Sequence, residues 1–176
     1  MGMPVLILGV GNVLLGDEGA GVHLLTLLGN HPDLPEEVTC LDGGVLGFEL
    51  ASVIAGLPAL ILLDAVQLGE EPGTVRVLDR AGMDHWLTGG CRSAHEVGLA
   101  DLLDSLKIDD ILPPCRALVA IQPASLDWGT SLTPPVANAL PMAADAVIQC
   151  IRLWRQPSAG TIASEENLHG DDRNTR

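Results

Sequence analysis

The sequence has few aromatic residues, few basic residues and no paired cysteine motif. Its 176 residues include one Phe, three Trp and no Tyr, which argues against platforms that stack bases or sugars. Nine basic residues stand against 23 acidic ones, so the formal charge is −14 and a nucleic-acid backbone would be repelled. The four cysteines are scattered without a C-x-x-C pair, which argues against both a zinc ribbon and a disulfide framework.

Signals for a membrane are also missing. No basic segment precedes the first apolar run, "PVLIL", and this run is far shorter than the roughly 20 residues that span a bilayer. We therefore predict a soluble, cytoplasmic protein without a membrane partner. With 47% apolar composition, the chain can form one domain, expected over residues 1–156. Residues 157–176 have sparse, unpatterned apolar side chains and are expected to form a disordered tail.

Apolar runs alternate with segments of helical periodicity along the chain. Continuous apolar or short alternating runs predict strands at Val5–Val10, Glu36–Gly44, Ala59–Val66 and Arg116–Pro123, and an edge or hairpin strand at Gly73–Asp79. Helical spacing predicts helices at Asp17–Leu28, Gly47–Leu57, Ser93–Ile108 and Thr133–Trp154. The pattern favours one three-layer α/β domain with a mostly parallel, twisted sheet and helices on both faces.

Two local features complete this prediction. Gly82, Gly89 and Gly90 indicate a loop between the edge strand and the following helix. Pro141 lies inside the last helical segment, where it should bend the helix or mark its true start.

The segment "GVGNVLLGDEGAGV" begins like a dinucleotide-binding loop, because it follows an apolar strand and precedes a helix. However, Leu14 replaces the third glycine of G-x-G-x-x-G. Asp17 and Glu18 then stand at the start of the helix, where they would repel a pyrophosphate. Gly9 and Gly11 allow a tight turn at the strand end, so the carboxylates are predicted to face a cation.

More polar groups are predicted at the same edge of the sheet. Ligands of parallel sheets bind beyond the carboxyl ends of the strands. Asp42 ends the second predicted strand, Asp64 ends the third directly after "LILL", and His95 starts a helix after a glycine-bordered loop. Asp64 is the hardest to explain structurally, because a carboxylate in an apolar strand is costly unless it is paired or bound.

The other members of this group also have purely structural explanations. Asp17 could be a helix N-cap, and Glu18 could interact with the helix dipole. Asp42 could form the turn before two glycines, and His95 could be a solvated or capping histidine. The coincidence of all five groups at one edge favours a functional site over five independent turns and caps.

The residue types favour a metal over a serine or cysteine nucleophile. Two carboxylates and an imidazole form a mixed oxygen and nitrogen donor set, which suits nickel, zinc or manganese. The G-x-S-x-G motif is absent, and neither Ser93 nor Cys91 lies in an elbow motif. The H-E-x-x-H motif is absent as well, because Leu99 occupies the place of its second histidine.

The segments "GVGNVLLGDEGAGV", "LDGG", "LILLDAV", "SAHEVGLADLL" and "SLTPPV" resemble the hydrogenase maturation endopeptidases, in the family's order, from about Pro4 to Trp154. The resemblance implies a cytoplasmic protease that removes the C-terminal extension of the nickel–iron hydrogenase large-subunit precursor after nickel insertion. The family's nickel-binding residues map onto Glu18, Asp64 and His95. Asp42 of "LDGG" is the candidate catalytic residue. The family has a glutamate after the proline that corresponds to Pro123, whereas this sequence has Ala124 at that place.

Several consequences follow from this resemblance. Nickel is expected to be carried by the substrate, with no tightly bound organic cofactor, and the metal could serve as a recognition element or as a Lewis acid. A nickel-binding chaperone without peptidase activity and a Rossmann-type transferase or reductase are the alternatives. The loop residues expected to support the site are Gly9, Gly11, Asn12, Asp17, Gly43, Gly44 and Ser93.

Overall fold

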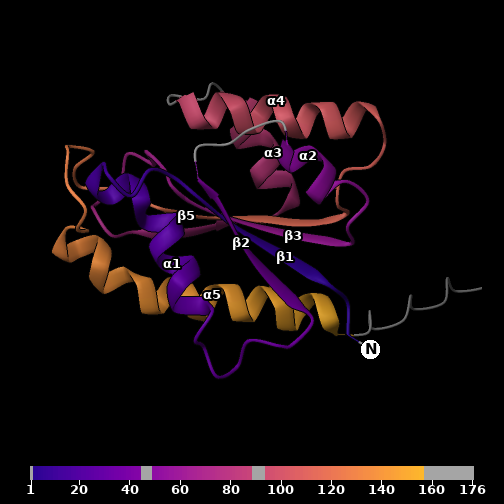
Figure 1. The fold of residues 1–176 in the computed structure, drawn as a ribbon, viewed down its shortest axis with the longest axis horizontal. Coiled ribbons are helices and arrows are strands. Elements are labelled where there is room, and N and C mark those ends of the chain that lie inside the picture. The colour runs from indigo at the N-terminus through magenta and orange to yellow at the C-terminus, as the bar shows by residue number, and fades with distance from the viewer. Residues whose placement is uncertain (1, 45–48, 89–93, 157–176) are drawn as a thin grey trace, which may run out of the picture.

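The computed structural model describes residues 2–44, 49–88 and 94–156 (Figure 1). Five strands lie at β1 (Val5–Val10), β2 (Val38–Gly44), β3 (Ala59–Ala65), β4 (Val75–Leu78) and β5 (Cys115–Ile121). A short 3-10 turn, η1 (Gly16–Gly19), precedes the first helix. The helices of the described residues are α1 (Ala20–Leu28), α2 (Glu49–Ile54), α3 (Arg80–Thr88), α4 (Ala94–Ile108) and α5 (Pro134–Arg155). The strands and most helices lie within a few residues of their predicted positions.

The strands form one sheet in the order β2-β1-β3-β5-β4, in which the first four run parallel and β4 runs antiparallel to β5. The predicted edge strand is therefore confirmed as β4. The central strands β1, β3 and β5 are almost entirely buried because helices cover both faces of the sheet. The predicted α/β architecture is confirmed.

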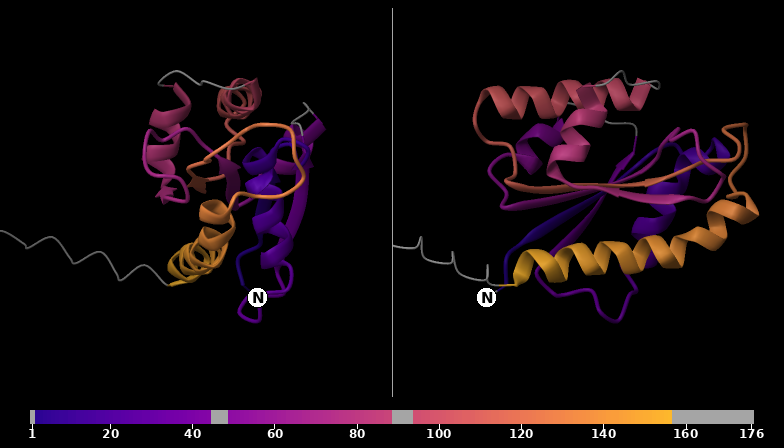
Figure 2. Two further views of the ribbon diagram at one scale, coloured as in Figure 1. Left: turned by 90° about the vertical axis from the view of Figure 1, so that its left-hand side faces the viewer. Right: turned by 180° about the vertical axis from the view of Figure 1, so that it is seen from behind.

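Helices lie on both faces of the sheet (Figure 2). The two faces form two separate apolar cores, and alternate residues of each strand enter different cores. In β1, Val5 and Ile7 pack with α1 and α5, whereas Leu6 and Leu8 point to the face covered by α2, α3 and α4. This three-layer arrangement places the carboxyl ends of the parallel strands at one edge of the sheet.

The predicted loop around Gly82 is wrong, because residues Arg80–Thr88 form helix α3. The Asp79 carboxylate accepts a hydrogen bond from the Gly82 N–H (3.0 Å) and so stabilises the first turn of this helix. Met83 is fully buried in the core, and Asp84 pairs with Arg116 of β5. Tertiary contacts therefore outweigh the low helix propensity of one glycine. Gly89 and Gly90 lie outside the described residues.

Helix α5 continues through Pro141, so the alternative that this proline marks the start of the helix is wrong. The helix is long and apolar enough to cross a membrane by length and composition alone. However, Val136, Val147 and Ile151 are buried against the sheet, as expected for a core helix. The predicted tail, residues 157–176, lies outside the described part of the chain.

Candidate active site

The strand register brings the candidate residues of β2 and β3 to either side of β1. Gly9 of β1 lies opposite Asp42 of β2 and opposite Leu63 of β3, the residue before Asp64. Asp42 and Asp64 therefore reach the same carboxyl edge of the sheet, as the sequence predicted. We call this edge, together with the loops that follow β1 and β5, the rim.

Close backbone packing brings Glu18 to the rim. A Cβ atom on Gly21 would lie 2.1 Å from the carbonyl oxygen of Leu63, so only glycine lets the start of α1 approach the end of β3. Gly11 has a φ of +125°, and a Cβ there would lie 1.9 Å from the carbonyl oxygen of Glu18. As a result, the η1 turn that carries Glu18 contacts β3, the strand that carries Asp64.

The three predicted carboxylates differ in exposure. Asp64 is buried, with 3% of its surface exposed, Glu18 is half-buried, and Asp42 is exposed. The Asp42 Oδ1 accepts a hydrogen bond from the Gly44 N–H (2.8 Å). This bond forms the turn that the sequence predicts as the purely structural role of Asp42. This bond also fixes the orientation of the Asp42 carboxylate at the rim.

Asp17 has a different role from the N-cap that was considered for it. It lies inside η1, and its fully buried carboxylate accepts four hydrogen bonds from the loop after β5 and the start of α5. The Ala124 and Ser125 N–H groups donate to Oδ2 (2.9 and 3.2 Å), as does the Thr133 hydroxyl (2.7 Å), and the Thr133 N–H donates to Oδ1 (2.7 Å). The expectation that both acidic residues of the loop face a cation is therefore wrong for Asp17.

These hydrogen bonds also affect the ionisation of Asp17. Burial by itself would raise the pKa of the carboxyl, but the bonds from Thr133, Ala124 and Ser125 outweigh it and hold the pKa below its ordinary value. The Ala124 contact uses the backbone, so it does not depend on the side chain at this position. Asp17 is therefore an ionised clamp between the first loop and the loop after β5.

His95 lies in the first turn of α4, but its side chain is outside the described part of the structure, as are Ser93 and Cys91. Within the side chains that are described, no three His, Cys, Asp or Glu residues gather in a way that could hold a metal ion. The combination of Glu18, Asp64 and His95 therefore stays a prediction.

The described thiols offer no nucleophile at the rim. Cys40, Cys115 and Cys150 are free, and Cys91 lies outside the described residues. Burial raises the pKa of the Cys40 and Cys150 thiols, which disfavours the reactive thiolate.

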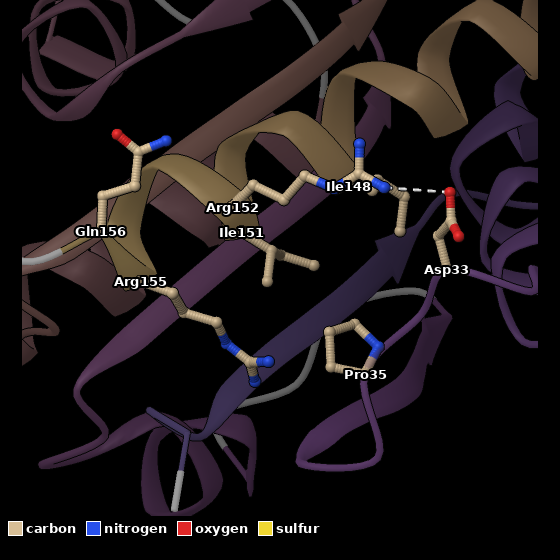
Figure 3. Close-up of a pocket in the computed structure, with 7 residues that line it drawn as sticks. All are labelled: Asp33, Pro35, Ile148, Ile151, Arg152, Arg155 and Gln156. Carbon is tan, nitrogen blue, oxygen red and sulfur yellow. Dashed lines mark hydrogen bonds and ion pairs between the residues drawn. The ribbon is translucent and has the colours of Figure 1, made fainter.

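A pocket of about 320 Å³ lies at the opposite end of the molecule, near the start of β2. Figure 3 shows the side chains that line it. It is lined by residues of the loop before β2 and of the C-terminal end of α5. There Arg152 pairs with Asp33 (3.0 Å), and Arg155 pairs with Glu37 (3.3 Å). These pairs tie the end of α5 to the loop before β2, so we assign this pocket a structural role.

Sequence reasoning missed two features that build the rim. Gly21 is part of the motif "GDEGAGV", but only the close packing of α1 against β3 explains why this position has no side chain. The last helix, predicted from Thr133, begins at Pro134 with Thr133 as its N-cap residue, and the hydrogen bonds of Thr133 to Asp17 join residues 116 positions apart. A short local motif carries no signal for such a contact.

The fold and the rim define an α/β protein whose ligand edge carries carboxylates instead of a phosphate-binding loop. Residues 22–150 match the family model described as hydrogenase maturation protease. The chain is 31% identical over 172 residues to the hydrogenase expression/formation protein HupD of Bradyrhizobium diazoefficiens, covering 96% of this chain and 90% of that protein. It is 37% identical over 151 residues to the hydrogenase 2 maturation protease of Escherichia coli, covering 85% and 92%.

Solved structures give the same result. The hydrogenase maturating endopeptidase HybD from E. coli superposes with a TM-score of 0.81 at 36% identity, over 86% of this chain and 94% of that one. The nickel–iron hydrogenase maturation protease HybD from Thermococcus kodakarensis has a TM-score of 0.71 at 27% identity, over 84% and 98%. The chain belongs to the hydrogenase maturation protease family and is an endopeptidase. The chaperone and transferase alternatives are not favoured.

Proposed function

We propose that this endopeptidase removes the C-terminal extension of the nickel–iron hydrogenase large-subunit precursor after nickel insertion, in the cytoplasm. Family membership supports the reaction class and the substrate class. The observation that carries the proposal is the buried Asp64 at the carboxyl end of β3, beside the η1 turn with Glu18. A carboxylate at the ligand edge of a parallel sheet can bind a cationic group on the substrate, because its oxygens are suitable metal ligands.

In this proposal the nickel belongs to the precursor, and the enzyme recognises it through Glu18, Asp64 and His95. Carboxylate and imidazole donors suit this metal, and three protein ligands leave positions open for ligands from the precursor. His95 is placed in the set by the family resemblance and by its position in the first turn of α4. We expect the isolated enzyme to hold nickel weakly and to need no organic cofactor.

Asp42 is the candidate group for activating or orienting the attacking water. Its carboxylate is exposed at the rim, where water can reach it, and the Gly44 N–H holds its orientation. The Asp42→Asn variant separates this role from turn formation, because an amide oxygen can still accept the Gly44 hydrogen bond but an amide is not a base. We expect Asp42→Asn to bind the nickel-loaded precursor and to cleave it slowly. Near-normal cleavage by the stable variant would show that Asp42 only stabilises the turn before Gly44 and has no part in hydrolysis.

The decisive experiment tests whether nickel is the recognition signal. Metal-free enzyme is incubated in parallel with nickel-loaded and nickel-free precursor, in a chelator too weak to strip the loaded precursor. Mass spectrometry then follows loss of the C-terminal extension. We expect cleavage of the nickel-loaded precursor only, and equal cleavage of both would refute recognition through nickel. A requirement for free metal added to the enzyme would instead support a Lewis-acid role.

A pair of histidine variants provides a control. His95→Ala should abolish cleavage with little loss of thermal stability, because it removes a ligand for the precursor's nickel. His85→Ala changes an exposed histidine of α3 and should cleave normally. Equal activity of the two variants would remove His95 from the proposed site.

A further inference from the structure

The rim carries an exposed apolar patch that the proposed chemistry does not use. Val13 and Leu14 of the first loop and Leu126 and Trp128 of the loop after β5 are all exposed, with Trp128 at 83% and Leu14 at 50%. We call these four residues the rim patch. Other exposed large apolar side chains, such as Val53 and Leu153, lie on different helices. Grouped apolar exposure marks interaction surfaces, whereas single exposed residues are ordinary.

The backbone under the rim patch is held in one arrangement by hydrogen bonds. Leu15 and Gly129 form a parallel bridge, so Leu14 and Trp128, one residue earlier on each segment, are neighbours. The Gly129 N–H donates to the Leu14 carbonyl (2.9 Å), and the Gly16 N–H donates to the Gly129 carbonyl (2.7 Å). A surface that is already ordered loses little conformational entropy when a partner binds.

The Asp17 clamp reinforces this arrangement, because its carboxylate binds the same loop at Ala124 and Ser125. The Ser125 hydroxyl also donates to Asp127 (2.8 Å), which fixes the turn before Trp128. An exposed tryptophan on a fixed loop is the kind of residue that contributes most to protein–protein affinity.

The charges around the rim patch indicate the chemistry of its partner. Segments 12–18 and 122–133 contain no basic residue, and the two acidic residues that reach the surface there are Glu18 and Asp127, since Asp17 is buried. The patch is also continuous with the candidate site, since Leu14 and Glu18 belong to the same loop. A complementary partner therefore presents apolar side chains flanked by positive charge, next to the group that reaches Glu18 and Asp64.

We propose that the rim patch docks the hydrogenase large-subunit precursor, through an apolar segment flanked by basic side chains beside its nickel site. This inference rests on the proposed function and deepens it, because it assigns substrate affinity to residues outside the nickel-binding set. In this arrangement Trp128 contributes contact area for binding, and Glu18 and Asp64 at the rim bind the nickel of the precursor.

The test compares the wild-type chain with Trp128→Ser and with Ile108→Ser. Ile108 is the matched control, because it is 84% exposed and ends α4, at the amino edge of the sheet. Initial cleavage rates are measured over a range of nickel-loaded precursor concentrations, and binding of the same precursor is measured directly. We expect Trp128→Ser to raise KM and Kd at least tenfold with kcat within twofold of wild type, and Ile108→Ser to leave all three unchanged.

The outcomes distinguish this inference from the proposed function. Normal KM and Kd in Trp128→Ser would overturn docking at the rim patch while leaving the protease proposal intact. A wild-type chain that binds the precursor through Trp128 but does not cleave it would overturn the protease proposal and retain the docking surface. A Trp128→Ser variant that loses only self-association would show that the patch binds a second copy of this chain, which also overturns the inference.

Discussion

Replacing Asp17 by asparagine should destabilise the protein more than any change at an exposed carboxylate. The carboxylate of Asp17 accepts four hydrogen bonds in a fully buried position. Three of them end on Oδ2 and one ends on Oδ1. An asparagine with its oxygen in the Oδ2 position keeps three acceptor contacts, but its amide then faces the Thr133 N–H as donor against donor.

The expected loss follows from this geometry. A hydrogen bond to a charged group contributes roughly 1.5–3 kcal/mol, and such contributions are not additive within one cluster. Losing one of these bonds and the negative charge behind the other three gives an expected decrease of about 2–4 kcal/mol in the free energy of unfolding. For a chain of this size the melting temperature should fall by roughly 5–15 °C.

The effect of Asp17→Asn should depend on pH in one direction. The pKa of Asp17 is lowered in the folded protein, so the ionised carboxylate stabilises the fold above the unfolded-state pKa of about 3.9. This contribution is lost as the pH falls through the lower folded-state pKa. The stability difference between wild type and Asp17→Asn should therefore be largest near neutral pH and shrink in acid.

Urea unfolding at neutral and acidic pH measures both expectations, with Asp104→Asn as the control because Asp104 is an exposed aspartate of α4. The control should stay within about 0.5 kcal/mol of wild type. The clamp would be refuted if Asp17→Asn were as stable as the control at neutral pH. A difference that does not shrink in acid would refute the role assigned to its ionised form.

Three further predictions concern the packing and the chain end. Gly21→Ala should cost about 2–3 kcal/mol because its Cβ meets a β3 carbonyl oxygen, whereas Gly29→Ala, with ordinary contacts only, should be nearly neutral in thermal unfolding. Asp84→Ala should cost about 3–5 kcal/mol because it leaves the buried Arg116 guanidinium without its carboxylate, and the double variant Asp84→Leu/Arg116→Met should recover a large part of this loss. Truncation after Gln156 should leave folding and cleavage intact, and a large fall in melting temperature or lost processing would contradict this.

The sequence alone determined the layers of the fold and the edge that carries the candidate site. Continuous apolar runs identified β1, β3 and β5, because a strand covered on both faces needs apolar side chains on both. The alternation of strands and helices then placed Asp42 and Asp64 at one edge, and the register confirms this placement. These features depend on local patterns, which a single sequence contains.

Only the tertiary structure decided the role of Asp17, helix α3 and the rim patch. The Asp17 carboxylate binds groups 107 to 116 positions away, so its neighbouring residues could not separate a clamp from an N-cap. Helix α3 forms despite Gly82 because Met83 and Asp84 find buried partners on the sheet. Likewise, Leu14 and Trp128 become neighbours only through the bridge at Gly129. Each of these features depends on a contact between distant segments, which exists only after the chain has folded.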